Sequence, residues 1–345
     1  MKNVTLGRTG ITVSQNAFGA LPIQRVSTEE AVKILRKAYD GGMRLFDTAR
    51  AYSDSEEKLG AAFGDGYCKR TDIVITTKTG AKDPDSFWKD LDTSLTNLKT
   101  DYIDVYQFHL MDCCWLCGDG TGMYECMEEA KRQGMIRHIG GTAHKVGIAR
   151  DIINSGMYET IQYPISYLAD DQELELIHLA NEKNVGFICM KGLAGGLITD
   201  SKAAMAFIGE YDGAVAIWGI QKESELDEWL SYMDDTPEMN DDIRKFIRSE
   251  RDELKNDFCR GCGYCMPCTM NILINNCNRM SLLLRRAPSE VWLNEYWQGE
   301  MKKAEECIGC GKCLPKCPYG LNIPELLKKN VEDYKEVLAG KRSVK

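Results

Sequence analysis

The sequence contains no long apolar run and no excess of basic residues. No stretch approaches the roughly 20 apolar residues that a membrane-spanning helix needs, and the amino-terminal MKNVTLGRTGITVSQ lacks the apolar core of a secretory signal. The net charge of −9 argues against nucleic acid or an anionic membrane as the main partner. We therefore expect a cytoplasmic protein that acts on a small molecule, with no membrane and no nucleic acid among its partners.

The sequence also lacks GxGxxG in its first strand–helix turn, GALPIQRVST, where an open dinucleotide-binding sheet would carry it. After a hairpin expected over residues 2–14, apolar runs alternate with amphipathic stretches. The expected strands cover 15–20, 43–49, 72–78, 102–109, 136–143, 160–166, 185–192 and 213–220, and the clearest helices cover 27–42, 83–98 and 171–184. Eight strand–helix repeats in about 230 residues suit a closed (β/α)8 TIM barrel, typically about 250 residues long, better than an open doubly wound sheet.

The alternation of strands and helices ends near Trp229. A charged segment follows, and then a cysteine-rich one with expected helices at 287–306 and 323–338. We therefore predict a barrel domain over residues 1–234. Residues 235–345 are predicted to form a helical linker and a small, mainly helical domain.

Four polar residues fall at or just after the carboxyl ends of three consecutive expected strands, where TIM barrels carry their chemistry. They are Asp47, Tyr52, Lys78 and His109. A lysine and an aspartate are costly to bury apart, so we expect Lys78 and Asp47 to pair. The ammonium group should lower the pKa of Tyr52 toward the working pH of an acid–base catalyst, and a neutral His109 could orient a substrate carbonyl beside the phenol.

Cysteine is abundant: the chain has fifteen, and nine of them lie between Cys259 and Cys317. In a long chain without a secretory signal this pattern favours metal or cluster ligation over disulfides. One run, C-x2-C-x2-C-x2-C, comprises Cys259, Cys262, Cys265 and Cys268, and the other, C-x2-C-x2-C-x3-C followed by proline, comprises Cys307, Cys310, Cys313 and Cys317. The second is the bacterial ferredoxin pattern, in which the fourth cysteine ligates the other cluster.

The two runs therefore predict two [4Fe–4S] clusters. One is held by Cys259, Cys262, Cys265 and Cys317, and the other by Cys307, Cys310, Cys313 and Cys268. Zinc is the competing interpretation, although it usually takes two C-x2-C pairs rather than a tight triplet with a distant fourth ligand. Cys277 could replace Cys268, because the first run has a shorter final spacing and no proline after it.

A smaller group of cysteines follows His109 in the segment DCCWLCGDG. Cys113, Cys114 and Cys117 could form a substrate-facing thiol or a further metal site with Cys126. The spacing C-C-x-x-C matches no common ligand pattern, so we expect small side chains that pack as apolar residues.

The segments FDTARAY, ITTKT, YQFHL and KRQGMIRHIGGTAH, together with the cysteine runs, resemble the iron–sulfur-containing branch of the aldo-keto reductases, with a barrel and a carboxy-terminal dicluster ferredoxin-like domain. The resemblance implies that Tyr52 is the acid–base residue and that Lys78 and Asp47 tune it. It also implies that His109 orients the carbonyl group.

The same resemblance suggests contacts to NADP or NAD. Gln162 matches the residue that hydrogen-bonds the nicotinamide carboxamide, Thr142 stands where the family usually has serine, and Met190 stands where an aromatic ring usually stacks. Gly195 and Gly196 in KGLAGGL offer backbone N–H groups to a pyrophosphate.

Three further features depart from the family pattern. Ala143 and Trp229 each stand where the family has asparagine, and Lys222 is the one basic residue in IQKESELDEWL. These departures put the recognition of a 2′-phosphate in question.

Three functions are compatible with these features. The first is an oxidoreductase that reduces a small carbonyl compound with NAD(P)H, or oxidises its alcohol with NAD(P)⁺. The second is a cluster-driven oxidoreductase that takes electrons from a ferredoxin-like partner without nicotinamide. The third is a non-catalytic electron-transfer protein, which the four-residue set at the strand ends disfavours.

Overall fold

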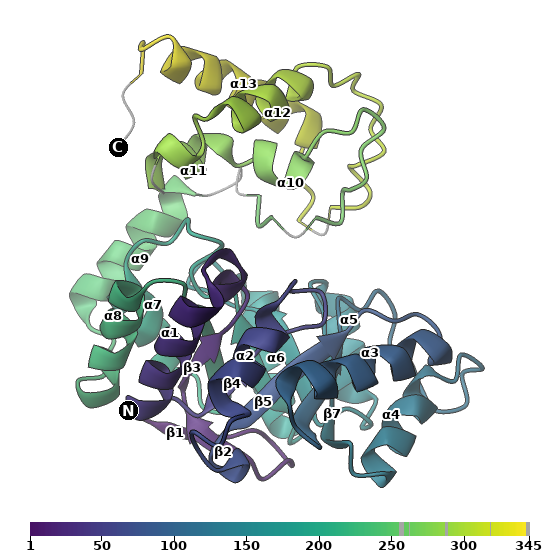
Figure 1. Ribbon diagram of the computed structural model, residues 1–345. Helices are drawn as coiled ribbons and strands as arrows, with labels where there is room; N and C mark the ends of the chain where they lie inside the picture. Colours follow the sequence, from purple (N-terminus) through teal and green to yellow (C-terminus); the bar gives the residue numbers. More distant parts are fainter. Residues whose placement is uncertain (255–258, 262, 287–288, 318, 343–345) are drawn as a thin grey trace. The chain divides into compact units, whose positions relative to one another are not determined.

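The computed structural model describes residues 1–254, 259–261, 263–286, 289–317 and 319–342 (Figure 1). Two compact units emerge. The barrel unit comprises Met1–Gly192 and Lys202–Asn240, and the cluster unit comprises Leu193–Ser201 and Asp241–Lys345. The short segment Leu193–Ser201 thus groups with the carboxy-terminal residues, although it follows the strand that ends at Met190.

The barrel unit is built on eight parallel strands that close in the order β10-β3-β4-β5-β6-β7-β8-β9. The strands are β3 (Asn16–Gly19), β4 (Leu45–Asp47), β5 (Val74–Thr79), β6 (Ile103–Phe108), β7 (Ile136–Thr142), β8 (Thr160–Pro164), β9 (Gly186–Met190) and β10 (Ala214–Gly219). They are buried along most of their length, as expected for parallel strands covered by helices. All eight predicted strands and the closed (β/α)8 architecture are confirmed.

Helices follow the strands around the barrel, as Figure 1 shows for α1 to α3. They are α1 (Thr28–Asp40), α2 (Ser55–Phe63), α3 (Pro84–Leu98), α4 (Met123–Arg132), α5 (Val146–Asn154), α6 (Asp171–Glu182), α7 (Ser201–Gly209) and α8 (Glu223–Asp234), with 3-10 turns η1 (Pro22–Arg25) and η2 (Arg70–Asp72). Local signals fix several helix starts. Ser27 and Asp170 each form a capping box with the glutamate three residues later, and Asp83 caps α3 just before a proline.

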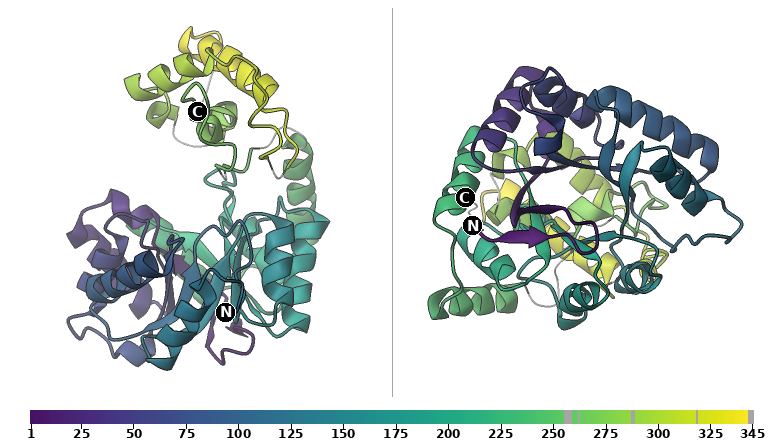
Figure 2. Two further views of the ribbon diagram at one scale, coloured as in Figure 1. Left: turned by 90° about the vertical axis from the view of Figure 1, so that its right-hand side faces the viewer. Right: turned by 90° about the horizontal axis from the view of Figure 1, so that it is seen from below.

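The predicted hairpin is confirmed as β1 (Asn3–Thr5) and β2 (Thr12–Ser14), paired antiparallel. It lies across the amino-terminal end of the strands in the view from below (Figure 2). Its apolar side chains Val4 and Val13 join a buried cluster with strand residues such as Ala17, Ile188 and Val215. The opposite end, where the strands terminate, is where the polar residues gather.

The cluster unit contains no β-strand among its described residues. Its helices are α9 (Asp241–Glu253), α10 (Ile274–Cys277), α11 (Met280–Arg286), α12 (Glu295–Ala304) and α13 (Ile323–Leu338), with the 3-10 turn η3 (Ser289–Val291). The longest, α13, buries an apolar stripe that includes Leu327, Val331 and Tyr334, and it packs beside α12 (Figure 1).

The structure refines the helices expected in this region. Within the helix predicted over 287–306, residues 287–288 lie outside the described residues and the α-helix begins at Glu295. The side chain of Asn294 caps it by accepting from the backbone N–H of Trp297 at 3.0 Å. The helices α10 and α11 are absent from the sequence-based expectation, because four and seven residues carry little periodicity and α10 lies in the asparagine-rich stretch NILINNCN. No helix in the described ranges combines the length and the apolar character needed to cross a membrane.

Candidate active site and cluster sites

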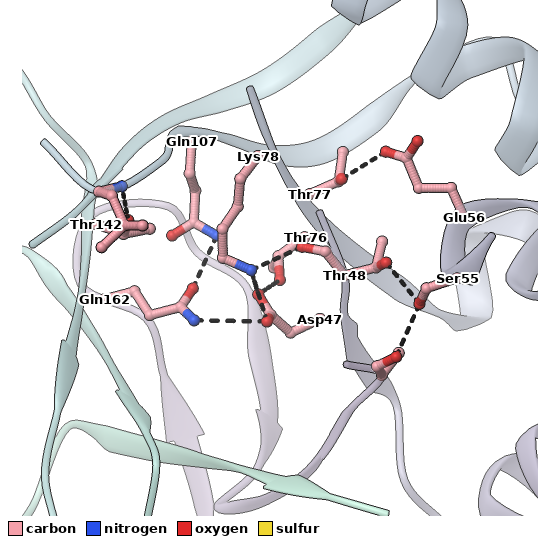
Figure 3. Close-up of polar contacts among 12 residues, drawn as sticks. Asp47, Thr48, Ser55, Glu56, Thr76, Thr77, Lys78, Gln107, Thr142 and Gln162 are labelled. Atoms are coloured by element: carbon pink, nitrogen blue, oxygen red, sulfur yellow. Dashed lines mark hydrogen bonds and ion pairs between the residues drawn. The ribbon is translucent and has the colours of Figure 1, made fainter. Parts of the chain in front are cut away.

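A buried ion pair forms the base of the candidate active site. Lys78 near the end of β5 and Asp47 at the end of β4 are 1% and 3% exposed, and Lys78 Nζ lies 2.7 Å from Asp47 Oδ2 and 2.9 Å from Oδ1 (Figure 3). The third ammonium donor reaches the carbonyl oxygen of Thr48 at 2.7 Å, and Thr76 donates to Asp47 Oδ1 at 2.6 Å. Every Lys78 donor is therefore used, and the expected pairing of Lys78 with Asp47 is observed.

Tyr52 and His109 lie above this pair. Lys78 Nζ is 5.1 Å from the centroid of the Tyr52 ring. The Tyr52 and His109 rings pack edge to face, with their centroids 5.7 Å apart. Burial raises the pKa of Tyr52; Lys78 opposes this shift and Asp47 adds to it. The expected net lowering of that pKa is therefore wrong: Lys78 acts in the expected direction, but burial outweighs it. Tyr52 is a neutral phenol at neutral pH and so a proton donor.

His109 is neutral as well. Burial, followed by the ammonium groups of Lys78 and Lys191, lowers the pKa of His109 to about 3. Its backbone N–H donates to the carbonyl oxygen of Thr79 at 2.8 Å, which fixes the segment just after β6. A neutral imidazole can donate one hydrogen bond to a substrate oxygen without carrying charge.

A glutamine absent from the sequence-based set extends the network. Gln107 Nε2 donates to Gln162 Oε1 at 3.0 Å, and Gln162 Nε2 donates to Asp47 Oδ2 at 3.5 Å (Figure 3). Gln107 is fully buried on β6, two residues before His109. A polar residue at this spacing, in a strand that is otherwise apolar near its end, is the signal that could have identified it.

Two other predicted cofactor residues also lie at strand ends. Thr142 ends β7, and its hydroxyl accepts a hydrogen bond of 2.7 Å from the N–H of Leu110, so it supports the segment that follows His109. Met190 ends β9 and is 9% exposed, within the apolar cluster inside the barrel. Trp229 is a core residue that stacks on Trp218 at 4.0 Å.

Lys222 lies before α8 and is exposed. The acidic neighbour Glu223 is neutralised from α1: Lys33 and Lys37 each lie 2.7 Å from it and lower the pKa of its carboxyl to about 2. Arg25 reaches the side chain of Gln221 at 3.4 Å. This edge is thus more basic than the local sequence indicates, because the added cations come from distant parts of the chain.

The remaining predicted residues lie in the cluster unit. Gly195 and Gly196 adopt φ of +68° and +90°, which glycine tolerates best. One pocket is lined by Cys268, Cys307, Cys310 and Cys313, the whole set predicted for the second cluster, and by Cys265. Another is lined by Cys259, Cys265 and Cys317.

In these two pockets Cys317 lies beside residues of the first run, and Cys268 lies beside residues of the second. The two ligand sets stay a prediction. Cys262 lies outside the described residues. Among the residues that are described, no three His, Cys, Asp or Glu side chains converge on a point that could hold a single ion.

A buried cation supports a cluster at the first set. Arg279 is 9% exposed, and its Nε has no hydrogen-bond partner in the described part of the chain. The first cysteine run lies against it, since a Cβ atom at Gly261 would be 2.5 Å from Arg279 Nη1. Thiolate-ligated clusters are anionic, so the residues present fit such a group.

The other cysteines do not join these sets. Cys277 is fully buried, lines neither pocket, and has its pKa raised to about 12 by burial. Cys114 is half-buried against other barrel residues, where burial raises its pKa to about 11, and Cys126 is buried on α4. The expected apolar packing holds for these two residues, whereas Cys113 and Cys117 are exposed.

Comparison with known proteins matches two parts of the chain to two different families. The profile of the aldo/keto reductase family matches residues 14–245, and that of a 4Fe-4S dicluster domain matches residues 258–322. L-galactose dehydrogenase of Arabidopsis thaliana is 30% identical over 211 residues, 56% of this chain and 66% of that protein. Aldo-keto reductase YhdN of Bacillus subtilis is 29% identical over 221 residues, 58% of this chain and 64% of that protein.

The chain therefore spans about two thirds of the length of these relatives. Among solved structures, an aldo-keto reductase from Bacillus halodurans in its holo form superposes with a TM-score of 0.60 at 22% identity, covering 72% of this chain and 96% of that one. At this identity the likeness concerns the fold. The extent of the family match shows that the chain belongs to the aldo/keto reductase family and carries a 4Fe-4S dicluster domain after its barrel.

Proposed function

We propose that the chain is an oxidoreductase of the cytoplasm that reduces a small carbonyl compound with NAD(P)H, or oxidises the corresponding alcohol with NAD(P)⁺. The observation that carries this proposal is the neutral Tyr52 phenol next to the buried Lys78–Asp47 pair, with neutral His109 beside it. A binding scaffold has no need of a buried ammonium beneath a phenol.

In the proposed reaction His109 donates a hydrogen bond to the carbonyl oxygen and orients it toward Tyr52. The nicotinamide, when bound, supplies the hydride to the carbonyl carbon. Tyr52 gives its proton to the oxygen, which completes the alcohol and leaves a tyrosinate. Lys78, held in place by Asp47, stabilises that tyrosinate, so it favours the product side of the proton transfer.

Six residues are proposed to hold the dinucleotide: Thr142, Gln162, Met190, Gly195, Gly196 and Lys222. Gln162 and Met190 come from neighbouring strands, since Pro164 of β8 pairs with Met190 of β9. Two exposed cations could receive a 2′-phosphate: Lys222, which follows β10, and Arg25 of η1, which contacts Gln221. They support NADP over NAD.

Two [4Fe–4S] clusters are proposed, held by Cys259, Cys262, Cys265 and Cys317 and by Cys307, Cys310, Cys313 and Cys268. Such clusters exchange single electrons. In the second set Cys310 is exposed, and its neighbour Ile308 is 63% exposed. An apolar side chain at an exposed cluster ligand is suited to contact with an electron-transfer protein.

A second candidate is a cluster-driven oxidoreductase that works without nicotinamide. It is favoured by the state of two cofactor residues: both ends of the Gln162 amide and the Thr142 hydroxyl are already engaged within the protein. In this case Tyr52 would still supply the proton, but the electrons would arrive through the clusters.

The test is anaerobic addition of NADPH and then NADH to the iron-loaded protein, with cofactor fluorescence and cluster absorbance recorded together. Tight binding and turnover of small aldehydes support the hydride reaction, and binding of neither cofactor would leave the cluster-driven function in its place. In the same assay Tyr52→Phe should lower kcat/KM by about 10²–10⁴-fold with iron content unchanged. Tyr67→Phe is the control, because Tyr67 is 40% exposed and bonded to Asp40 on the surface.

A further inference from the structure

A buried arginine joins the loop Leu193–Ser201 to the cysteine segment of the same unit. Arg279 lies between α10 and α11, and its Nη2 donates a hydrogen bond of 2.7 Å to the carbonyl oxygen of Gly195. Among the described residues this is the one hydrogen bond of the guanidinium group to the protein, and no described carboxylate forms an ion pair with it. A guanidinium with five N–H donors is costly to bury with a single acceptor, so an anion is expected beside it.

The backbone leaves room for this side chain at two glycines. A Cβ atom at Gly195 would lie 2.8 Å from Arg279 Nη2, and one at Gly261 would lie 2.5 Å from Nη1. Gly261 lies within the first cysteine run and Gly195 within the loop proposed to bind pyrophosphate. Gly196, the next residue, has a similar positive φ, but a Cβ there would meet nothing within 4 Å.

The anion that fits is the cluster proposed at the first set of cysteines. Cys259 lies two residues before Gly261, at which a Cβ atom would meet Arg279 Nη1. Four thiolates leave a bound cluster with a net negative charge, which grows when the cluster takes an electron. A positive charge beside it therefore stabilises the reduced form and raises the reduction potential.

We propose that Arg279 is a positioning residue that serves both sites at once: it is the counter-ion of the cluster at Cys259, Cys265 and Cys317, and it holds Gly195 in the shape that binds a dinucleotide phosphate. This inference rests on the proposed nicotinamide function. Because one guanidinium serves both sites, cluster charge and nucleotide binding are coupled, and the coupling acts equally in both directions.

The experiment measures both cluster potentials by anaerobic titration, and the affinity for ADP-ribose, which has the pyrophosphate but no nicotinamide to accept electrons. Arg279→Gln should shift one cluster's reduction equilibrium about tenfold toward the oxidised form, about 59 mV for a one-electron couple, and leave the other unchanged. It should weaken ADP-ribose binding about tenfold, as expected for loss of a charge-assisted hydrogen bond. Arg279→Lys keeps the charge and should restore the potential, a recovery that a purely structural role does not predict.

A matched pair of glycine variants provides the second arm. Gly195→Ala and Gly196→Ala both strain the backbone and should both weaken ADP-ribose binding, but only Gly195→Ala displaces Arg279 and should lower one potential. If Arg279→Gln fails to load iron, this pair decides. If the potentials are unchanged in all variants and the unmodified chain binds ADP-ribose normally, the role proposed for Arg279 is overturned and the nicotinamide function is not. Failure of the unmodified chain to bind ADP-ribose overturns the coupling together with the nicotinamide function.

Discussion

The barrel and cluster units place their functional groups by different means. In the barrel, a closed ring of parallel strands holds Asp47 and Lys78, and every donor of the ammonium group is satisfied by protein atoms. In the cluster unit, the described cysteines of the two runs line two pockets, and buried Arg279 lacks a full set of partners in the described part of the chain. The barrel site is complete as folded protein, whereas the cluster unit is built around groups that the protein must acquire.

The two units also differ in what resists unfolding. The barrel combines ladder hydrogen bonds with a core drawn from every strand. The cluster unit has a smaller core in which α13 is the main apolar surface, supplemented by the bidentate pair Arg285–Asp333 at 2.6 and 2.7 Å. Small domains of this kind commonly depend on metal ligation, because their core alone supplies little stability.

The largest expected effect is therefore on the cluster unit. Cys317→Ala should lose about half the iron and melt the fold around its pocket, since cluster binding and folding are coupled. Iron analysis and circular dichroism measure this effect, and the rate of carbonyl reduction, which depends on Tyr52, shows whether the barrel is intact. Cys277→Ala is the control: Cys277 lines neither pocket, so the iron content should not change. Equal iron loss in both variants would contradict the proposed ligand sets.

A smaller effect is expected in the barrel from Asp47→Ala. This change leaves Lys78 buried and unpaired, which should cost about 3–5 kcal/mol in the free energy of unfolding. The double variant Asp47→Leu with Lys78→Met removes both charges and should recover much of this loss. Urea unfolding followed by tryptophan fluorescence measures both variants; a double variant less stable than Asp47→Ala would argue against charge burial as the cause.

The difference between the two units also explains which features could be predicted from the sequence. Strand and hairpin positions follow from local apolar patterns, and the Lys78–Asp47 pair follows from the cost of burying either charge alone. The direction of the Tyr52 pKa shift could not be predicted from the sequence. Burial raises this pKa and Lys78 lowers it, and the extent of burial is a property of the whole fold. Gln107 was missed for a similar reason: its role appears only once β6 and β8 place it against Gln162.

In the cluster unit the periodic spacing of cysteines predicts the crossed ligand sets, since that pattern is set by the cluster rather than by the fold. Arg279 could not be identified in this way. It contacts Gly195, 84 residues earlier, and no local motif marks a contact of that separation. Short helices such as α10 also escape prediction, because four residues carry too little periodicity.

The smallest effect concerns pH and the opposite end of the barrel. Burial alone would raise the pKa of Glu159, but hydrogen bonds from His138, Lys131 and the N–H of Ile139 outweigh it and bring that pKa to about 2. A carboxyl whose pKa is lower in the folded chain stabilises it fully above the unfolded value of 4.5, and that stability is lost as pH falls from 4.5 through about 2. Because Lys131 is 41% exposed, solvent screening limits the effect to about 1–2 kcal/mol.

Glu159→Gln should therefore reduce the free energy of unfolding at pH 7. It should also make the loss of stability between pH 4.5 and about 2 less steep, as measured by urea unfolding across this range. Glu175→Gln is the control, since Glu175 is 66% exposed in its pair with Arg150. If the free energy of unfolding falls as steeply with pH in Glu159→Gln as in the unmodified chain, the acid sensitivity belongs to the cluster unit instead.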